Sequence, residues 1–308
     1  MKISKVKRIS VICLSMIAVV LIQLLFSLSL SGGISVQASM PFYGLNSQEL
    51  VLRSRFSTVY TKSISERKSN IKLAASSFNG YFLDVGAEFS FNRVVGRRTT
   101  SRGYKNAKII VQGKFVDGVG GGVCQVSTTL YNAVLSAGLR VTEFHAHSLP
   151  VSYVPPSFDA MVNSGSADLR FVNDTSGPII IYTKADGDRL TVSIWGEPLT
   201  EEIRRESVII GKISAPAEER IKDVNGEYPD LFFGESKVIS YSKDGIKSEG
   251  FLIKFLDGRA VSKVKIRSDN YNSQKGLIIE GTAVRPTDYG EEEVEQSFPF
   301  CDENVYEL

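Results

Sequence analysis

Residues 118–138 read Gly-Val-Gly-Gly-Gly-Val-Cys-Gln-Val-Ser-Thr-Thr-Leu-Tyr-Asn-Ala-Val-Leu-Ser-Ala-Gly, and they decide the fold around them. Four glycines in the first five positions predict a tight turn. The apolar residues that follow recur at three-to-four spacing, which predicts a helix that ends at Gly138. Cys124 therefore lies at the start of a helix, where free N–H groups and the positive end of the helix dipole favour a thiolate.

The glycine turn also predicts an oxyanion hole. Glycine lets the backbone approach a ligand closely and can aim N–H donors at a developing negative charge. We expect the N–H groups of Cys124 and Gln125 to be these donors, with Gly120, Gly121 and Gly122 forming the loop beside them. Such an arrangement favours acyl transfer.

The chain contains two histidines, His145 and His147, on a segment (141–147) whose alternating pattern predicts a strand. Residues two apart on a strand face the same side. We expect one imidazole to be the base that activates the cysteine, and Asp159 or Asp168 to orient the ring.

Two other interpretations of these residues stay open. A cysteine between valines is often a small core residue. Two histidines on one strand face, together with a thiolate, also form a set that zinc can bind. A phosphate loop is excluded because the glycine run lacks the Lys-Ser/Thr ending of a nucleotide-binding loop. Our expectation is a site without metal or cofactor.

The composition is that of a folded protein. Of the 308 residues, 43% are hydrophobic and 23% are charged, which excludes wholesale disorder and a polytopic membrane protein. The 36 Lys and Arg nearly balance the 34 Asp and Glu, for a formal net charge of +2. Nucleic acid is therefore not an expected partner.

Residues 1–38 have the pattern of an export segment. Basic residues precede an apolar run from Ile9 to Leu30, and small residues follow it. The run fits a cleaved signal peptide or an uncleaved membrane anchor, and either places the rest outside the cytoplasm. Cys13 lies in this segment. Only Cys124 and Cys301 remain outside it, too few for a disulfide framework.

The rest of the chain predicts an α+β fold. We expect a spacer at 39–63, a central α/β domain at 64–197, a small elongated all-β module at 206–285 and an acidic tail at 286–308. A helix from Ser65 and a hairpin at 179–195 belong to the central domain.

Five segments together carry a family resemblance. They are EFSFNRVVG (88–96), RGYKNAKII (102–110), GGGVCQVSTTLYNAVLSAGL (120–139), EFHAHSLPVSYVPPSFDAMV (143–162) and SADLRFVNDTSGPIIIY (166–182). They closely resemble the VanW domain over residues 64–195. Ser157 stands where that family usually has glycine and Met161 where it usually has threonine, whereas the cysteine and both histidines are intact.

The resemblance implies an activity, because some VanW members are regarded as L,D-transpeptidases. Cys124 would attack the third residue of a peptidoglycan tetrapeptide stem, expel D-Ala and pass the acyl group to an amine of another stem. His145 or His147 would move the protons. A hydrolase that uses the same cysteine, or a wall-binding protein without catalysis, are the alternatives.

Residues 206–285 are similar to the five-glycine domain that often follows VanW domains. The similarity rests on Gly245, Gly250, Gly258, Gly276 and Gly281, and it implies adhesion or amino-sugar binding. We therefore expect an extracytoplasmic bacterial protein that is membrane-anchored or secreted to the cell wall. Its expected partners are stem peptides and glycan, and also the membrane if the N-terminal segment is uncleaved.

Overall fold

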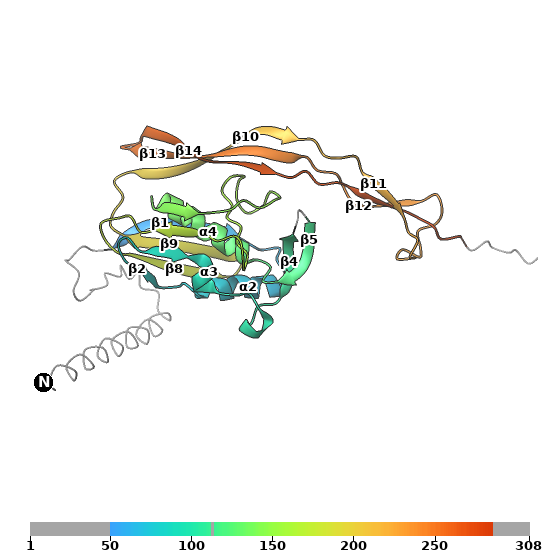
Figure 1. Cartoon of the computed structure of the whole chain (residues 1–308), viewed down its shortest axis with the longest axis horizontal. Helices are drawn as coiled ribbons and strands as arrows, with labels where there is room; N and C mark the ends of the chain where they lie inside the picture. Colours follow the sequence, from blue (N-terminus) through green and yellow to red (C-terminus); the bar gives the residue numbers. More distant parts are fainter. Residues whose placement is uncertain (1–49, 112–113, 286–308) are drawn as a thin grey trace, which may run out of the picture. The chain divides into compact units, whose positions relative to one another are not determined.

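The computed structural model describes residues 50–111 and 114–285 (Figure 1). The predicted export segment, most of the spacer, the acidic tail, Cys13 and Cys301 lie outside these residues. Within the described part, no helix has both the length and the apolar character needed to cross a membrane.

A four-stranded antiparallel sheet supports the helix that carries Cys124. Its order is β1-β9-β8-β2. The strands are β1 (Val51–Val59), β2 (Tyr81–Leu83), β8 (Ile179–Asp186) and β9 (Arg189–Gly196). Helix α4 (Val123–Ser136) packs on β1 and β9, and α2 (Ser65–Ser76) packs on β8 and against α4 (Figure 1).

Two smaller sheets and two short helical segments complete this part of the chain. A three-stranded sheet has the order β3-β7-β6, and β4 and β5 form a separate hairpin. These elements are β3 (Glu88–Ser90), α3 (Phe91–Val95), a 3-10 turn (Thr100–Arg102), β4 (Asn106–Val111), β5 (Lys114–Val119), β6 (Arg140–Glu143) and β7 (Arg170–Val172).

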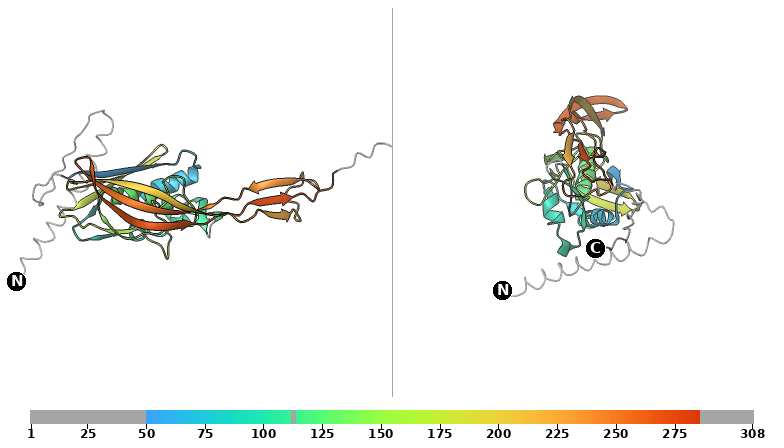
Figure 2. Two further views of the ribbon diagram at one scale, coloured as in Figure 1. Left: turned by 90° about the horizontal axis from the view of Figure 1, so that it is seen from above. Right: turned by 90° about the vertical axis from the view of Figure 1, so that its right-hand side faces the viewer.

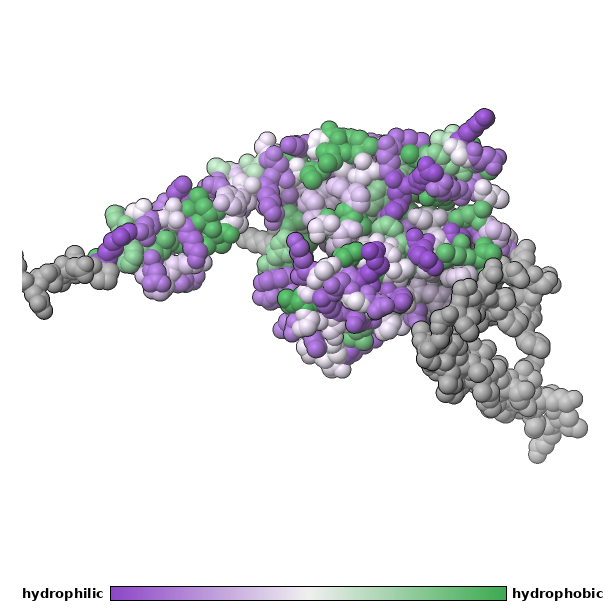
Figure 3. All heavy atoms as spheres, turned by 180° about the vertical axis from the view of Figure 1, so that it is seen from behind, coloured by the Kyte–Doolittle hydropathy of each residue, from purple (hydrophilic) through white to green (hydrophobic). Residues whose placement is uncertain are grey.

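Residues 202–280 are built from strands in two three-stranded sheets. The first, β10-β13-β14, is antiparallel, and in the second, β11-β15-β12, strand β11 runs parallel to β15 (Figure 2). The strands are β10 (Glu202–Ile213), β11 (Glu219–Lys222), β12 (Ser236–Ser240), β13 (Gly245–Leu256), β14 (Arg259–Tyr271) and β15 (Leu277–Glu280). The first sheet buries Ser248, Arg267 and Tyr271. Phe233 and Tyr241, which flank β12 of the second sheet, are exposed, and hydrophobic and hydrophilic residues are interspersed on the face in Figure 3.

Helix α4 is the centre of the core. Its apolar side chains, such as Val126 and Leu130, are fully buried, and so are several polar ones. The polar side chains are satisfied internally, since Thr129 Oγ1 lies 2.8 Å from Thr58 Oγ1 and Asn132 Nδ2 donates to the Phe158 carbonyl at 2.7 Å. Burial on all sides fixes the helix, and therefore the direction of its N-terminal end.

The predicted α+β class with a central α/β domain is wrong. The described residues contain three α-helices but fifteen strands, spread over several small sheets. An α/β domain needs parallel strands joined by helical crossovers. Here the sheet under α4 is antiparallel throughout, and its edge strand β1 comes from the segment predicted as a spacer. The predicted hairpin at 179–195 is confirmed as β8 and β9.

Candidate active site

The glycine run forms a tight turn into α4. Gly120 and Gly122 have φ values of 89° and 105°, in the region that favours glycine. A Cβ at Gly121 would lie 2.7 Å from the Lys108 carbonyl oxygen, so the turn packs directly against β4. The glycines therefore shape the turn and pack it against the protein, and Cys124 becomes the second residue of the helix.

The two predicted oxyanion donors have different surroundings. The Gln125 N–H donates to the Gly122 carbonyl at 3.0 Å, whereas no described residue accepts a hydrogen bond from the Cys124 N–H. The Gln125 side chain is buried and donates to Thr58 Oγ1 at 3.0 Å and to the Val59 carbonyl at 3.1 Å. Gln125 thus ties α4 to β1, and the Cys124 N–H remains available for a ligand.

His147 and Asp159 form a buried pair. Asp159 Oδ2 lies 2.7 Å from His147 Nδ1 and also accepts the His147 backbone N–H at 2.7 Å. The two residues are 6% and 1% exposed. Because Nδ1 is held by the carboxylate, Nε2 is left to face the thiol.

The Cys124 thiol donates to the Val162 carbonyl at 3.3 Å, and the His147 imidazole is close enough to shift the pKa of the thiol. Burial raises the pKa of the Cys124 thiol, but the hydrogen bond and charge of His147, with smaller contributions from the Val162 backbone and Arg98, outweigh burial and lower the pKa. Burial lowers the pKa of His147, yet the hydrogen bonds to Asp159 and Cys124 raise it to about 9. Both shifts favour a thiolate–imidazolium pair.

Two arginines contribute positive charge near the thiol. Arg98 lies over the glycine turn, since a Cβ on Gly120 would be 3.0 Å from Arg98 Cβ. Its Nη2 atom is buried and has no partner among the described residues. Arg67 on α2 donates to Gln125 Oε1 at 2.8 Å. The charges of both arginines interact with that of Cys124, and burial lowers the pKa of each guanidinium.

His145 and Asp168 have other hydrogen-bond partners, although the charge of Asp168 acts on Arg98. Strand β6 ends at Glu143, so the predicted strand to residue 147 and the shared histidine face are wrong. His145 Nε2 lies 3.0 Å from Glu143 Oε1, and its side chain is 38% exposed. Asp168 accepts from Ser90 Oγ at 2.6 Å and from the Asn92 N–H at 2.8 Å, which fixes the start of α3.

An open pocket of about 560 Å³ is lined by Gln125, Arg67 and Tyr153, and Cys124 is not among its lining residues. Gln125 follows Cys124 in the sequence, and Arg67 and Tyr153 interact electrostatically with the thiol. Lys62 and Lys108 also line this pocket. The full lining is Val59, Tyr60, Thr61, Lys62, Ser63, Ile64, Arg67, Lys108, Gln125, Ser152 and Tyr153, which includes no acidic side chain among the described residues. The pocket therefore suits a ligand with negative charge.

The zinc interpretation requires at least three ligands close together. Among residues 50–111 and 114–285, no three His, Cys, Asp or Glu side chains are grouped so that they could hold a metal ion. The two histidines have different carboxylate partners, Glu143 and Asp159.

Several polar residues of the site were not predicted from the sequence. Arg67 and Arg98 lie in segments that read as a helix surface and a polar loop, and Tyr153 follows the histidines in an irregular segment. Only Tyr153 lies in one of the five segments that resemble VanW, whereas Arg67 and Arg98 lie outside them and had no signal. Tyr271, which contacts Asp159, lies 112 residues away from it and had no local signal.

Comparison with known proteins places this site in a named domain. Residues 66–195 match the family model described as "VanW like protein". The uncharacterized protein YoaR of Bacillus subtilis (strain 168) is 43% identical over 141 residues, 46% of each chain. The vancomycin B-type resistance protein VanW of Enterococcus faecalis (strain ATCC 700802 / V583) is 29% identical over 133 residues, 42% of this chain and 48% of that one. The matched part thus spans about half the length of each relative.

Two solved structures of G5 domains are also similar in part. The IgA1 protease G5 domain has 23% identity and a TM-score of 0.18, and covers 27% of this chain and 90% of its own. HP0197-G5 has 16% identity and a TM-score of 0.15, and covers 26% of this chain and 97% of its own. The five-glycine assignment of residues 206–285 stays a prediction. Residues 66–195 form a VanW domain, and Cys124, His147 and Asp159 all lie within it.

Proposed function

We propose that this protein is a cell-wall cysteine acyltransferase, an L,D-transpeptidase that links peptidoglycan stem peptides through a thioester on Cys124. The observation that supports it best is the series Cys124–His147–Asp159, in which Cys124 lies at the start of α4 and the other two residues are buried. A nucleophile, an imidazole and an orienting carboxylate in this order are the general requirement of cysteine acyl transfer. The named relative VanW, a vancomycin resistance protein, agrees with a role at the cell wall.

In the first half-reaction the Cys124 thiolate attacks the carbonyl carbon that precedes the terminal D-Ala. The electron pair of the C=O bond moves to oxygen, and the Cys124 N–H stabilises that oxyanion. The C–N bond then breaks as the imidazolium of His147 gives its Nε2 proton to the leaving amine. A thioester on Cys124 and free D-Ala result.

In the second half-reaction an amine of another stem attacks the thioester. His147 takes the proton that the amine loses, and the C–S bond breaks to regenerate the thiolate. Asp159 keeps the ring oriented in both halves, since it holds Nδ1 and the His147 backbone N–H. Water in place of the amine gives the hydrolase with the same residues.

The pocket lined by Gln125, Arg67 and Tyr153 is the proposed site for the donor peptide. Stem peptides carry free carboxylates, and the pocket presents Arg67, Lys62 and Lys108. The buried, unpartnered Nη2 of Arg98 near the thiol supplies a further donor for an anionic group. Charge-assisted contacts of this kind orient a substrate strongly.

The test is muropeptide analysis after the purified full-length protein is incubated with disaccharide tetrapeptide, with and without an amine acceptor. The transpeptidase releases D-Ala and forms cross-linked product only when acceptor is present, and Cys124→Ala abolishes both. Release of D-Ala without cross-link identifies the hydrolase. Full activity in Cys124→Ala contradicts catalysis by this cysteine.

A further inference from the structure

Tyr271, the last residue of β14, contacts the carboxylate that orients His147. Its hydroxyl donates to Asp159 Oδ1 at 2.5 Å and accepts the Ser157 N–H at 2.7 Å. Tyr271 is fully buried. The two oxygens of Asp159 thus have different partners. Oδ2 is hydrogen-bonded to His147, and Oδ1 accepts from Tyr271, which lies outside the VanW match.

Arg267 on the same strand fixes Asp159 from a second direction. Its Nη1 donates to the Asp159 backbone carbonyl at 2.7 Å, and its Nη2 lies 3.6 Å from Asp159 Oδ1. Asp269 holds the guanidinium in place through contacts of 2.6 and 2.9 Å, and the group also lies 4.7 Å from the centre of the Phe144 ring. Arg267 is only 6% exposed and therefore belongs to the buried interior.

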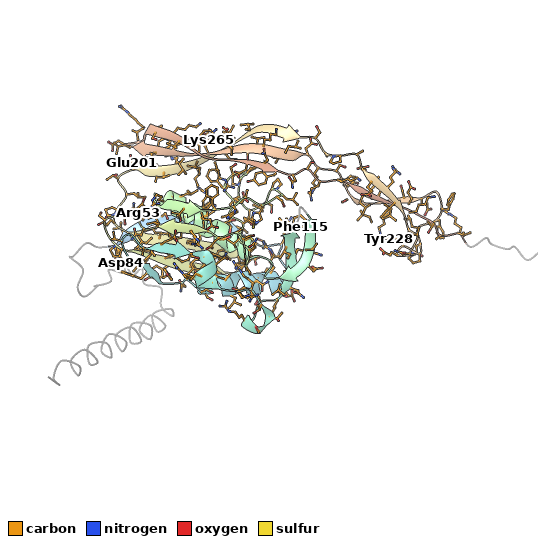
Figure 4. All side chains as sticks on the ribbon, in the orientation of Figure 1. Arg53, Asp84, Phe115, Glu201, Tyr228 and Lys265 are labelled. Atoms are coloured by element: carbon orange, nitrogen blue, oxygen red, sulfur yellow. The ribbon has the colours of Figure 1, made fainter. Side chains whose placement is uncertain are left out.

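The segment that carries His147 and Asp159 is tied to the sheet β10-β13-β14 along its length. Figure 4 shows side chains filling the space between this sheet and α4. Ser148 accepts the Asn272 N–H through its carbonyl at 2.7 Å, and Ser157 Oγ lies 2.7 Å from Ser248 Oγ. A Cβ on Gly250 would lie 2.9 Å from the Ser157 carbonyl oxygen, so the backbones approach closely.

Ser157 shows how tightly this segment is held. It has a φ of 64°, a conformation that costs a residue other than glycine free energy. Its hydrogen bonds to Tyr271 and Ser248 come from two strands of the sheet. The sheet therefore determines a loop conformation that the loop alone would not favour.

We propose that β14 is part of the catalytic unit and that Tyr271 and Arg267 are positioning residues, which hold Asp159 so that it can orient His147. A buried carboxylate keeps its charge and its place only when its oxygens are satisfied by donors. Here the donors on one side come from residues 259–271, outside the family match at 66–195. This inference rests on the site of the proposed function and adds a role for the C-terminal strands besides any binding to the wall.

The test uses the full-length protein and the conservative variant Tyr271→Phe, with Tyr241→Phe at an exposed tyrosine as the matched control. Iodoacetamide labelling of Cys124 is followed across pH by mass mapping, so that labelling of the other cysteines is counted separately. Loss of the Tyr271 hydroxyl removes a donor from Asp159, and its carboxylate then protonates at higher pH. We expect the acid limb of the Cys124 profile to move up by about 1 pH unit, with labelling at pH 6 about tenfold slower. Tyr241→Phe leaves the profile unchanged.

A double-variant measurement separates positioning from general damage. If Tyr271 acts through Asp159, the Tyr271→Phe substitution has no further effect on labelling in an Asp159→Asn background. Arg267→Lys is the second variant. It keeps the positive charge but loses the bidentate contact with Asp269 and the bond to the Asp159 carbonyl, and we expect the acid limb of the Cys124 profile to move in the same direction. Circular dichroism and thermal unfolding establish that each variant is folded.

Superimposable profiles for the unmodified protein and folded Tyr271→Phe, or an equal shift in the Asp159→Asn background, would overturn the inference. If Tyr271→Phe does not fold, an unshifted profile in Arg267→Lys overturns it instead. Labelling needs no peptide substrate. An absence of transpeptidation with a shifted profile therefore counts against the proposed function alone, whereas cross-linking with an unshifted profile counts against the inference alone.

Discussion

Asp159 Oδ2 lies 2.7 Å from Nδ1 of His147 and accepts that residue's backbone N–H at the same distance. One carboxylate oxygen thus fixes both the ring and the backbone of the histidine. This double contact makes Asp159 the orienting group and leaves Nε2 as the only ring nitrogen that can serve Cys124.

The first prediction compares two aspartates. Asp159→Asn should lower turnover of tetrapeptide donor by about 10²–10⁴, because the amide can stabilise neither the imidazolium nor the required tautomer. Asp168→Asn should keep turnover within about threefold and lower stability instead, since Asp168 holds the start of α3. Steady-state kinetics and thermal unfolding measure the two effects. Equal losses of turnover would argue against Asp159 as the orienting group.

The second prediction concerns the histidines. His147→Ala should reduce turnover by at least about 10² because it removes the imidazole that faces the thiol. His145→Ala should leave turnover nearly unchanged, since His145 contacts Glu143 and is partly exposed. Rates on the same donor peptide, with folding checked by circular dichroism, test the contrast. An inactive, folded His145→Ala protein would contradict the assignment.

These two comparisons show how much of the site the sequence could predict. The glycine turn, the start of α4 and the position of Cys124 follow from local patterns. The choice between Asp159 and Asp168 does not, because the segment from Phe144 to Asp159 is irregular and is held by hydrogen bonds to α4 and β14. The fold class was missed for a similar reason. Strands distant in the sequence pair antiparallel, as β1 does with β9 and β2 with β8, and local patterns do not reveal such pairs.

The third prediction is a pH profile. The thiolate–imidazolium pair exists above the lowered pKa of Cys124 and below the raised pKa of His147, about 9. The charged groups around the pair are Asp159, Arg98, Arg67 and, behind the carboxylate, Arg267. The rate constant kcat/KM should therefore be high at neutral pH and fall as the pH rises through about 9, where the imidazolium loses its proton. A rate that keeps rising beyond that pH would contradict a His147 general acid.

The same shift contributes to stability. Because the folded-state pKa of His147 is raised, the stabilisation is complete below the ordinary value of 6.5 and is lost as the pH rises through about 9. The lowered pKa of Cys124 acts in the opposite direction over this range, so the comparison is made without the thiol: the free energy of unfolding should fall by more in Cys124→Ala than in the double variant Cys124→Ala, His147→Gln. Urea unfolding at several pH values measures this difference, and identical pH dependences would count against the raised pKa.

The fourth prediction tests the turn. Gly122→Ala should destabilise the protein by about 2–4 kcal/mol, because its φ is 105° and the new Cβ would lie 3.0 Å from Arg67 Cγ and from Ile71 Cγ1. Gly187→Ala, in the open hairpin turn with φ 54°, is the matched control and should cost only about 1 kcal/mol. Denaturant unfolding compares the two. Equal losses would show that close packing at Gly122 is unimportant.

The most direct measurement is the intact-protein mass after incubation with a carbapenem, followed by peptide mapping. Its strained carbonyl presents an electrophile to the same thiolate and oxyanion donor that would act on a stem peptide. The account predicts a single covalent adduct on Cys124 that is absent in Cys124→Ala, forms much more slowly in His147→Ala, and blocks turnover of tetrapeptide donor. An adduct at another residue that inhibits equally, or undiminished turnover in Cys124→Ala, would contradict acyl transfer through Cys124.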